Sequence, residues 1–116
     1  MSEQPENLRV HVEREVGTTI VRLAGEIDLR SSPSLRGLFL SLLLETPARI
    51  ILDLSQVRYI DSSGVGTIVE LKRRAGRSDG LVVLVGLQAR VRSIFEIAKL
   101  DRFFTITQTV DEARQI

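Results

Sequence analysis

The sequence contains no cysteine and a single histidine, His11. The absence of cysteine excludes disulfide frameworks, thiolate metal sites and cysteine nucleophiles. One histidine cannot supply a histidine-rich metal site, and it can serve a catalytic triad only as the base. Because His11 falls on the polar face of an expected strand, we interpret it as a solvated surface residue. We therefore expect no metal centre in this chain.

Long hydrophobic runs and phosphate-binding motifs are also missing. No apolar run approaches the ~20 residues of a transmembrane helix, and residues 1–7 are too polar and acidic for a signal peptide. Gly64 and Gly66 stand without the Gly-Lys-Ser/Thr of a P-loop and without the spacing Gly-x-Gly-x-x-Gly. We therefore expect a cytoplasmic domain with no membrane insertion and no nucleotide or other cofactor.

The charges nearly balance, with 16 lysines and arginines against 15 aspartates and glutamates and a net charge of +1. This balance gives no reason to expect broad attraction to nucleic acid or membranes. One basic run, Lys72, Arg73, Arg74 and Arg77, ends an expected helix and has two interpretations: a nucleic-acid patch, or cations that complement the helix dipole. No aromatic residue is interleaved in the run, so we favour the second and expect no direct nucleic-acid binding.

The 116 residues suffice for one domain with a buried core. Alternating apolar residues at 8–13 predict a strand, and residues 18–24 predict a second strand that completes a hairpin. The apolar runs 49–54 and 81–85 predict strands covered on both faces. The single helical segment between them, at 62–75, makes a right-handed βαβ unit with parallel strands.

A further helix follows the hairpin. Ser32 is its predicted N-cap and Pro33 its first residue, because the missing N–H of proline would be unpaired there anyway. The helical spacing of apolar residues from Leu35 onward gives it a core-facing stripe. Leu40 and Leu44 lie outside this stripe, where the hairpin covers them or a partner contacts them. We favour cover by the hairpin.

The C-terminal third predicts three short elements. Residues 87–100 have the spacing of a helix, with Ile97 off its apolar face as a candidate for surface contact. Residues 103–106 predict a strand at a sheet edge. The sequence at 109–112 has the spacing of a capping box and should open a last helix that runs to the chain end.

Two pairs of carboxylates were considered as a catalytic site: Glu26 with Asp28, and Asp53 with Asp61. Capping and turn carboxylates occur in any α/β domain, and no histidine or metal cluster accompanies these. We therefore expect no catalytic residues and no enzyme.

The start of the helix at Ser62 is the remaining candidate site. A helix N-terminus leaves backbone N–H groups unpaired and favours an anion. A hydroxyl there can cap the helix, or it can become the anion if it is phosphorylated beside the repelling carboxylate of Asp61. From the residues alone, a cap is the more common role for such a serine.

The run Tyr59-Ile60-Asp61-Ser62-Ser63-Gly64-Val65-Gly66, with the segments at 23–28, 51–54 and 91–100, resembles the STAS domain of bacterial anti-sigma-factor antagonists. The resemblance implies a single α/β domain over 8–116, after a flexible lead-in at 1–7. It implies a mixed sheet of four to five strands around the parallel βαβ unit, with helices packed mainly on one face.

The resemblance also implies a regulatory role. The unphosphorylated domain binds a serine kinase that doubles as the anti-sigma factor, so the sigma factor is released; phosphorylation of Ser62 blocks this binding, and a serine phosphatase is a further partner. Partner contacts are expected around that serine, at Asp28, Asp61, Ser62, Ser63, Gly64 and Gly66. We interpret the two glycines as room for the partner's backbone.

One alternative function is carried by the same family. Some members are accessory subunits of membrane lipid transporters, and the same face would then dock on the transporter's ATPase. The intact acceptor serine, Ser62, and the lack of a membrane segment favour the regulatory class.

Overall fold

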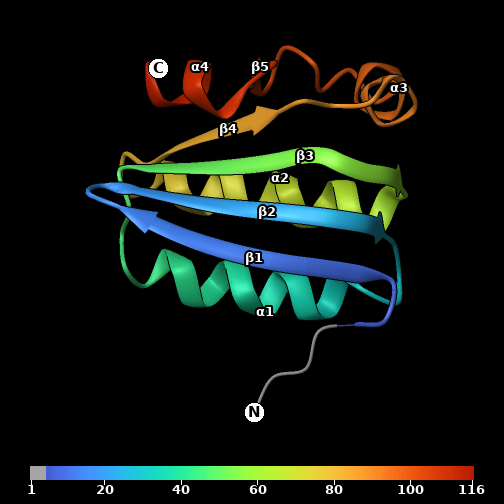
Figure 1. Ribbon diagram of the computed structural model, residues 1–116, viewed down its shortest axis with the longest axis horizontal. Helices are drawn as coiled ribbons and strands as arrows, with labels where there is room; N and C mark the ends of the chain where they lie inside the picture. Colours follow the sequence, from blue (N-terminus) through green and yellow to red (C-terminus); the bar gives the residue numbers. More distant parts are fainter. Residues whose placement is uncertain (1–4) are drawn as a thin grey trace.

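Within the described part of the chain, five strands form one mixed sheet in the order β1-β2-β3-β4-β5 (Figure 1). This computed structural model describes residues 5–116. β1 and β2 pair antiparallel as the predicted hairpin, and each later strand pairs parallel with the one before it. The strands are β1 (Leu8–Glu15), β2 (Thr18–Ile27), β3 (Arg49–Ile60), β4 (Leu81–Val85) and β5 (Thr105–Thr107). The helices are α1 (Ser32–Leu43), α2 (Ser62–Gly76), α3 (Ala89–Ile97) and α4 (Val110–Arg114).

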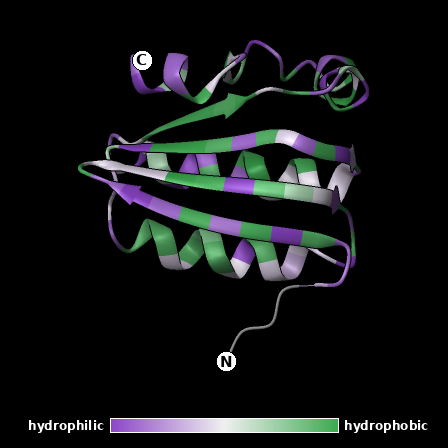
Figure 2. Ribbon diagram, in the orientation of Figure 1, coloured by the Kyte–Doolittle hydropathy of each residue, from purple (hydrophilic) through white to green (hydrophobic). Residues whose placement is uncertain are grey.

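The main core lies on the sheet face that α1, α2 and α3 cover, where Phe39, Leu71 and Phe95 pack against residues such as Leu52. A smaller cluster on the other face joins Ile20, Ile51, Val83 and Val85 to Ala113 of α4. Figure 2 shows a hydrophobic β4 and a largely hydrophilic β1, as expected for a central and an edge strand. The predicted fold class, including helices mainly on one face, is confirmed.

β3 is twice as long as predicted. The sequence predicted a strand that ends at Leu54 and a loop after it, but the strand continues to Ile60 and only Asp61 separates it from α2. The extension pairs with β2 alone, since β4 pairs no further than Asp53. A strand that has lost one neighbour tolerates polar residues, which explains why residues 55–60 did not look like a buried strand.

The start of α1 differs from the prediction by one residue. Ser31, not Ser32, is the N-cap, and its side chain does not cap the helix. The Ser31 hydroxyl instead accepts the N–H of Asp28 at 3.0 Å and donates to the carbonyl of Glu26 at 2.9 Å. Ser32 is the first helical residue, and its hydroxyl is free to reach α2.

The C-terminal elements are shorter than predicted. α3 spans nine residues instead of the predicted 87–100. β5 begins at Thr105 and not at Phe103, because Phe104 is buried and its ring packs edge-on against that of Phe95, with the centroids 5.6 Å apart. β5 does lie at a sheet edge, as predicted. The predicted helix start is confirmed, since Thr109 is the N-cap and its Oγ1 accepts the N–H of Glu112 at 3.1 Å. The Glu112 carboxylate accepts the Thr109 hydroxyl at 3.2 Å in place of the backbone N–H of a full capping box, and α4 ends at Arg114.

The apolar residues that lie off the core-facing stripes differ in exposure. Leu44 is 85% exposed, so the expected cover by the hairpin is wrong there, while Leu40 is half-buried. Ile97 is exposed, as predicted. Residues 1–4 lie outside the described residues, and the loose lead-in does not extend to Asn7, whose carbonyl accepts the N–H of Glu26 at 2.8 Å. Within residues 5–116, no helix has the length and apolar character needed to cross a membrane.

Candidate functional site

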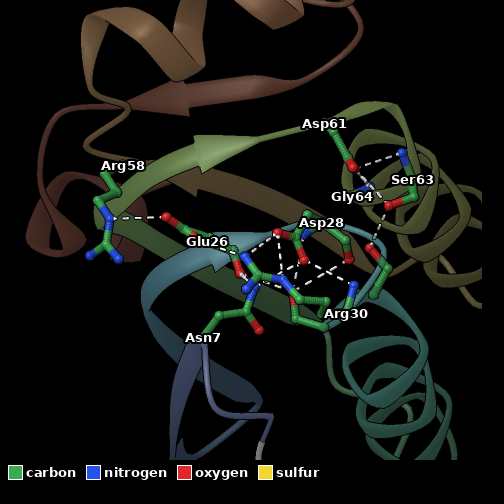
Figure 3. Close-up of polar contacts among 10 residues, drawn as sticks. Asn7, Glu26, Asp28, Arg30, Arg58, Asp61, Ser63 and Gly64 are labelled. Carbon is green, nitrogen blue, oxygen red and sulfur yellow. Dashed lines mark hydrogen bonds and ion pairs between the residues drawn. The ribbon is translucent and has the colours of Figure 1, made fainter.

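The site lies where the C-terminal ends of β2 and β3 meet the N-termini of α1 and α2 (Figure 3). Because β2 and β3 are parallel, the residues that follow them come side by side. The N–H of Asp61 donates to the carbonyl of Ile27 at 3.1 Å. This bond brings Asp28, which follows β2, next to the first turn of α2.

Asp61 is the N-cap of α2. Its backbone is extended, and its Oδ1 accepts the N–H groups of Ser63 at 3.0 Å and Gly64 at 3.2 Å. A carboxylate in this position satisfies two otherwise unpaired donors and complements the helix dipole. The interpretation of a serine as the cap of this helix is therefore wrong, because the preceding aspartate fills that role.

The two serines of the first turn have different environments. The Ser63 hydroxyl donates to Asp61 Oδ1 at 2.6 Å and lies 3.0 Å from the Ser32 hydroxyl, so it joins the starts of α2 and α1. Ser62, one residue earlier, is exposed, and its hydroxyl has no hydrogen-bond partner within residues 5–116. Of the two, only Ser62 presents a free hydroxyl to solvent.

Asp28 is held as an anion by several donors. The Arg30 side chain lies 2.8 Å from Oδ2, and the Arg30 N–H and the Asn7 amide donate to Oδ1, each at 2.9 Å. These bonds, led by that of the guanidinium, lower the pKa of Asp28 from 3.8 to about 2, against the opposing effect of burial. The side chain of Asp28 is 13% exposed, so a partner could contact only a small part of it.

An ion-pair network borders this aspartate. Arg30 also lies 2.8 Å from Glu26, and Arg58 contacts the other oxygen of Glu26 at 3.3 Å. Asn7, Arg30 and Arg58 were missed in the sequence. The spacing of Glu26 and Arg30 gave no signal, because the i, i+4 rule applies to helices and Glu26 lies in β2. Asn7 gave none either, because its contact depends on the chain segment that leads into the hairpin.

The two glycines of α2 also differ. Gly64 is buried, and a Cβ there would lie 2.7 Å from Ile27 Cγ2 and 2.8 Å from Ile60 Cγ1. The space above Gly64 is thus filled by the domain itself, and its interpretation as room for a partner's backbone is wrong. Gly66 is exposed with nothing within 4 Å of a built Cβ, so for Gly66 that role stays a prediction.

The carboxylates considered as catalytic pairs are engaged elsewhere. Glu26 and Asp28 share Arg30, while Asp53 pairs with Arg22 at 2.9 Å instead of facing Asp61. Across residues 5–116, no three His, Cys, Asp or Glu side chains gather in a way that could hold a metal ion. What this geometry offers is a surface with one free hydroxyl beside fixed carboxylates.

Comparison with known proteins gives consistent matches over nearly the whole chain. A model of the STAS domain matches residues 9–113. The anti-sigma-B factor antagonist of Bacillus subtilis is 32% identical over 101 residues, which cover 87% of this chain and 92% of that protein.

Solved structures resemble the fold closely. An anti-sigma factor antagonist from Mycobacterium paratuberculosis has a TM-score of 0.86 at 24% identity, covering 98% of this chain and 97% of that one. The anti-sigma factor antagonist SpoIIAA has a TM-score of 0.82 in its unphosphorylated form, at 24% identity, and the match covers 93% of this chain and 98% of that one. Its phosphorylated form has a TM-score of 0.74 at 23% identity, and the match covers 92% of this chain and 97% of that one. At these identities the likenesses show a shared fold.

Proposed function

The chain belongs to the STAS domain family, and we propose that it acts as a phosphorylation-switched antagonist of an anti-sigma factor. In this proposal the unphosphorylated protein binds, in the cytoplasm, a serine kinase that is also the anti-sigma factor, and so frees the sigma factor. Phosphorylation of Ser62 blocks the binding, and a serine phosphatase restores it. The protein itself catalyses nothing.

The free hydroxyl of Ser62 is the observation that carries the proposal. A kinase must reach the acceptor oxygen, and Ser62 is exposed with no side-chain hydrogen bond within residues 5–116 that would have to break first. Ser63 would first have to leave Asp61 and Ser32. Transfer forms a bond between Ser62 Oγ and the γ-phosphorus of ATP, breaks the bond from that phosphorus to ADP, and releases the hydroxyl proton.

The capping by Asp61 supports a switch that acts on the surface. Because Asp61 already accepts the N–H groups of Ser63 and Gly64, those donors are not available to neutralise a phosphate on Ser62. The phosphate, at about −1.5 to −2 charges, would stand in solvent next to a carboxylate. The fold would then change little, while a partner surface matched to a neutral serine would meet a dianion.

Phosphorylation of single variants tests the proposal. The protein is incubated with ATP and, one at a time, with the kinase-type anti-sigma factors encoded in its own genome, and the products are read by intact-mass spectrometry. We expect one phosphate on the wild type and on Ser63→Ala, and none on Ser62→Ala. Phosphate on Ser62→Ala at the wild-type level would disprove the assignment of the acceptor.

Binding measurements test the switch itself. Ser62→Glu places a negative charge at the acceptor, and we expect it to weaken binding to the same anti-sigma factor about tenfold or more. Ser93→Glu, which adds the same charge at an exposed serine of α3 outside the expected partner contacts, serves as the control and should bind as the wild type does. Equal affinity of Ser62→Glu, Ser62→Ala and the wild type would rule out control at this residue.

A further inference from the structure

A groove lies between the C-terminal ends of α1 and α2, at the opposite end of α2 from Ser62. It has a volume of about 560 Å³, and its lining includes Leu44 of the α1 end and Arg77 of the α2 end. α2 is 15 residues long, so at about 1.5 Å per residue the groove lies roughly 20 Å from Ser62. It is separate from the site described above.

The floor of the groove is apolar and uncovered. Leu40 and Leu43 of α1 line it half-buried, Ala75 of α2 lies beneath, and Leu44 projects from its rim 85% exposed. Figure 2 shows the hydrophobic colour along the end of α1 that faces the β1–β2 turn. A contiguous apolar surface rimmed by polar residues is typical of an interaction site.

All charges that line the groove are positive. Among residues 5–116, the charged residues that line it are Arg74 and Arg77. Arg74 shares Glu70 with Arg36, and Arg77 has no ion pair within residues 5–116. The groove therefore has uncompensated positive charge beside its leucines.

Apart from Glu70, which pairs with Arg74, the nearby acidic residues do not offset this charge. Glu45, at the end of α1, is held by Arg14 through two hydrogen bonds of 2.9 Å. Asp79, in the turn after α2, does not line the groove. A second hollow of about 460 Å³ adjoins along α2, where Arg73, Arg74 and Arg77 line it together with Glu70. Because Glu70 already pairs with Arg36 and Arg74, it leaves Arg73 and Arg77 without an ion pair within residues 5–116.

We propose that this groove binds an acidic amphipathic helix of a partner protein. Its apolar side chains pack on Leu40, Leu43 and Leu44, in the manner of a helix laid into a hydrophobic groove. Its carboxylates pair with Arg74 and Arg77, whose planar guanidinium groups suit two-point contacts with carboxylates. The leucines off the core stripe, Leu40 and Leu44, and two arginines of the basic run, Arg74 and Arg77, thus lie on one surface.

The groove is independent of the state of Ser62. The separation of roughly 20 Å exceeds the screening length of about 8 Å at physiological ionic strength. A phosphate on Ser62 therefore changes the potential at Arg77 very little. The groove is a docking site that stays available in both states of the switch, and it holds whether or not the proposed function is correct.

A nuclear magnetic resonance titration of the full chain tests the proposal. The probe is a blocked synthetic helical peptide with leucines at i, i+3, i+4 and i+7 and glutamates on either side. We expect shifts of amide signals at Leu40, Leu44 and Arg77, and affinities about tenfold lower for Leu44→Ser and Arg77→Glu. Both positions are exposed, so the variants keep the fold, which circular dichroism checks.

Matched controls separate this site from others. Arg90→Glu reverses an exposed arginine of α3 that also has no ion pair within residues 5–116, and it should bind the peptide as the wild type does. Ser62→Glu should also bind unchanged. A tenfold loss with either control would overturn the location or the independence of the groove.

Other occupants give distinguishable results, each of which would overturn the proposal. Equal binding of a peptide with lysines in place of the glutamates would show that charge does not select the ligand. Shifts with laurate but none with the acidic peptide would identify a site for a small amphiphile. Concentration-dependent shifts of the groove signals without peptide would identify a second copy of the chain as the occupant.

Discussion

Asp61 and Ser63 are joined through a single carboxylate oxygen. Oδ1 of Asp61 accepts both the N–H of Ser63 at 3.0 Å and its hydroxyl at 2.6 Å. This arrangement uses the aspartate and the second serine to build the start of α2, and it leaves the residue between them without a structural task. The acceptor proposed above is thus the one polar side chain of this turn that can change without altering the fold.

The first prediction concerns the cap. Asp61→Ala removes the acceptor of two N–H groups, so we expect a loss of about 1–2 kcal/mol in the free energy of unfolding, measured with urea. Asp61→Asn keeps a side-chain oxygen in place, so its free energy of unfolding should fall clearly less than that of Asp61→Ala. If alanine and asparagine cost the same, the cap does not stabilise this helix.

The second prediction concerns the contact between the hydroxyls of Ser32 and Ser63, which lie 3.0 Å apart. A double-mutant cycle with both serines changed to alanine should give a coupling free energy of about 0.5–1.5 kcal/mol. The control pairs Ser63→Ala with Ser41→Ala, because the Ser41 hydroxyl bonds the carbonyl of Leu38 within its own helix. That pair should be additive, and additivity in both cycles would show that the contact contributes nothing.

The third prediction concerns pH. Arg30 is the main cause of the lowered pKa of Asp28, about 2 instead of 3.8. A carboxyl whose pKa is lower in the folded state stabilises the fold above its unfolded pKa, and this stabilisation is lost as pH falls through the folded pKa. The contribution of Asp28 is therefore complete above about pH 4 and lost towards pH 2.

Arg30→Ala tests this assignment. The pKa of Asp28, followed by nuclear magnetic resonance, should rise towards 3.8, and the urea midpoint should fall less steeply between pH 4 and pH 2. Arg90→Ala, which changes an arginine of α3, should leave both unchanged. An unaltered pKa in Arg30→Ala would assign the shift to Asn7 and the backbone instead.

The fold was largely predictable because its signals are local. The alternation of β1, the apolar runs of β3 and β4 and the helix start at Thr109 each follow from residues close in sequence. The second half of β3 was not predictable in this way. Its polar residues are tolerated because β4 ends at Val85, opposite Asp53 of β3. Where a neighbouring strand ends is a property of the sheet and not of the local sequence.

The site was predictable only in its sequence motif. The resemblance pointed to Ser62. Ser63 differs from Ser62 through a local bond to Asp61 and through a distant contact with Ser32, 31 positions before Ser63. The donors to Asp28 likewise include Asn7, which lies 21 positions away. Such pairings follow from the register of β2 on β3 and the placement of α1, and no local pattern encodes them.

The last prediction separates the two glycines of α2. At Gly64 a methyl group would lie 2.8 Å from the carbonyl oxygen of Ile27 as well as against Ile27 and Ile60 side chains. A backbone atom cannot move aside as a side chain can, so α2 would have to shift away from β2 and β3. We expect Gly64→Ala to lower the free energy of unfolding by about 1–3 kcal/mol.

Gly66→Ala is the matched control, because it adds the same methyl group two residues later in the same helix. Gly66 is exposed, and a Cβ added there would have no other atom within 4 Å. Because alanine favours the helix more than glycine does, the free energy of unfolding should rise by up to about 1 kcal/mol. If the two variants change the free energy of unfolding, measured with urea, in opposite directions, Gly64 is required for close packing within the domain. A stabilised Gly64→Ala would mean that α2 can move off the strand ends at little cost, and the position of Asp61 and Ser62 would then be adjustable.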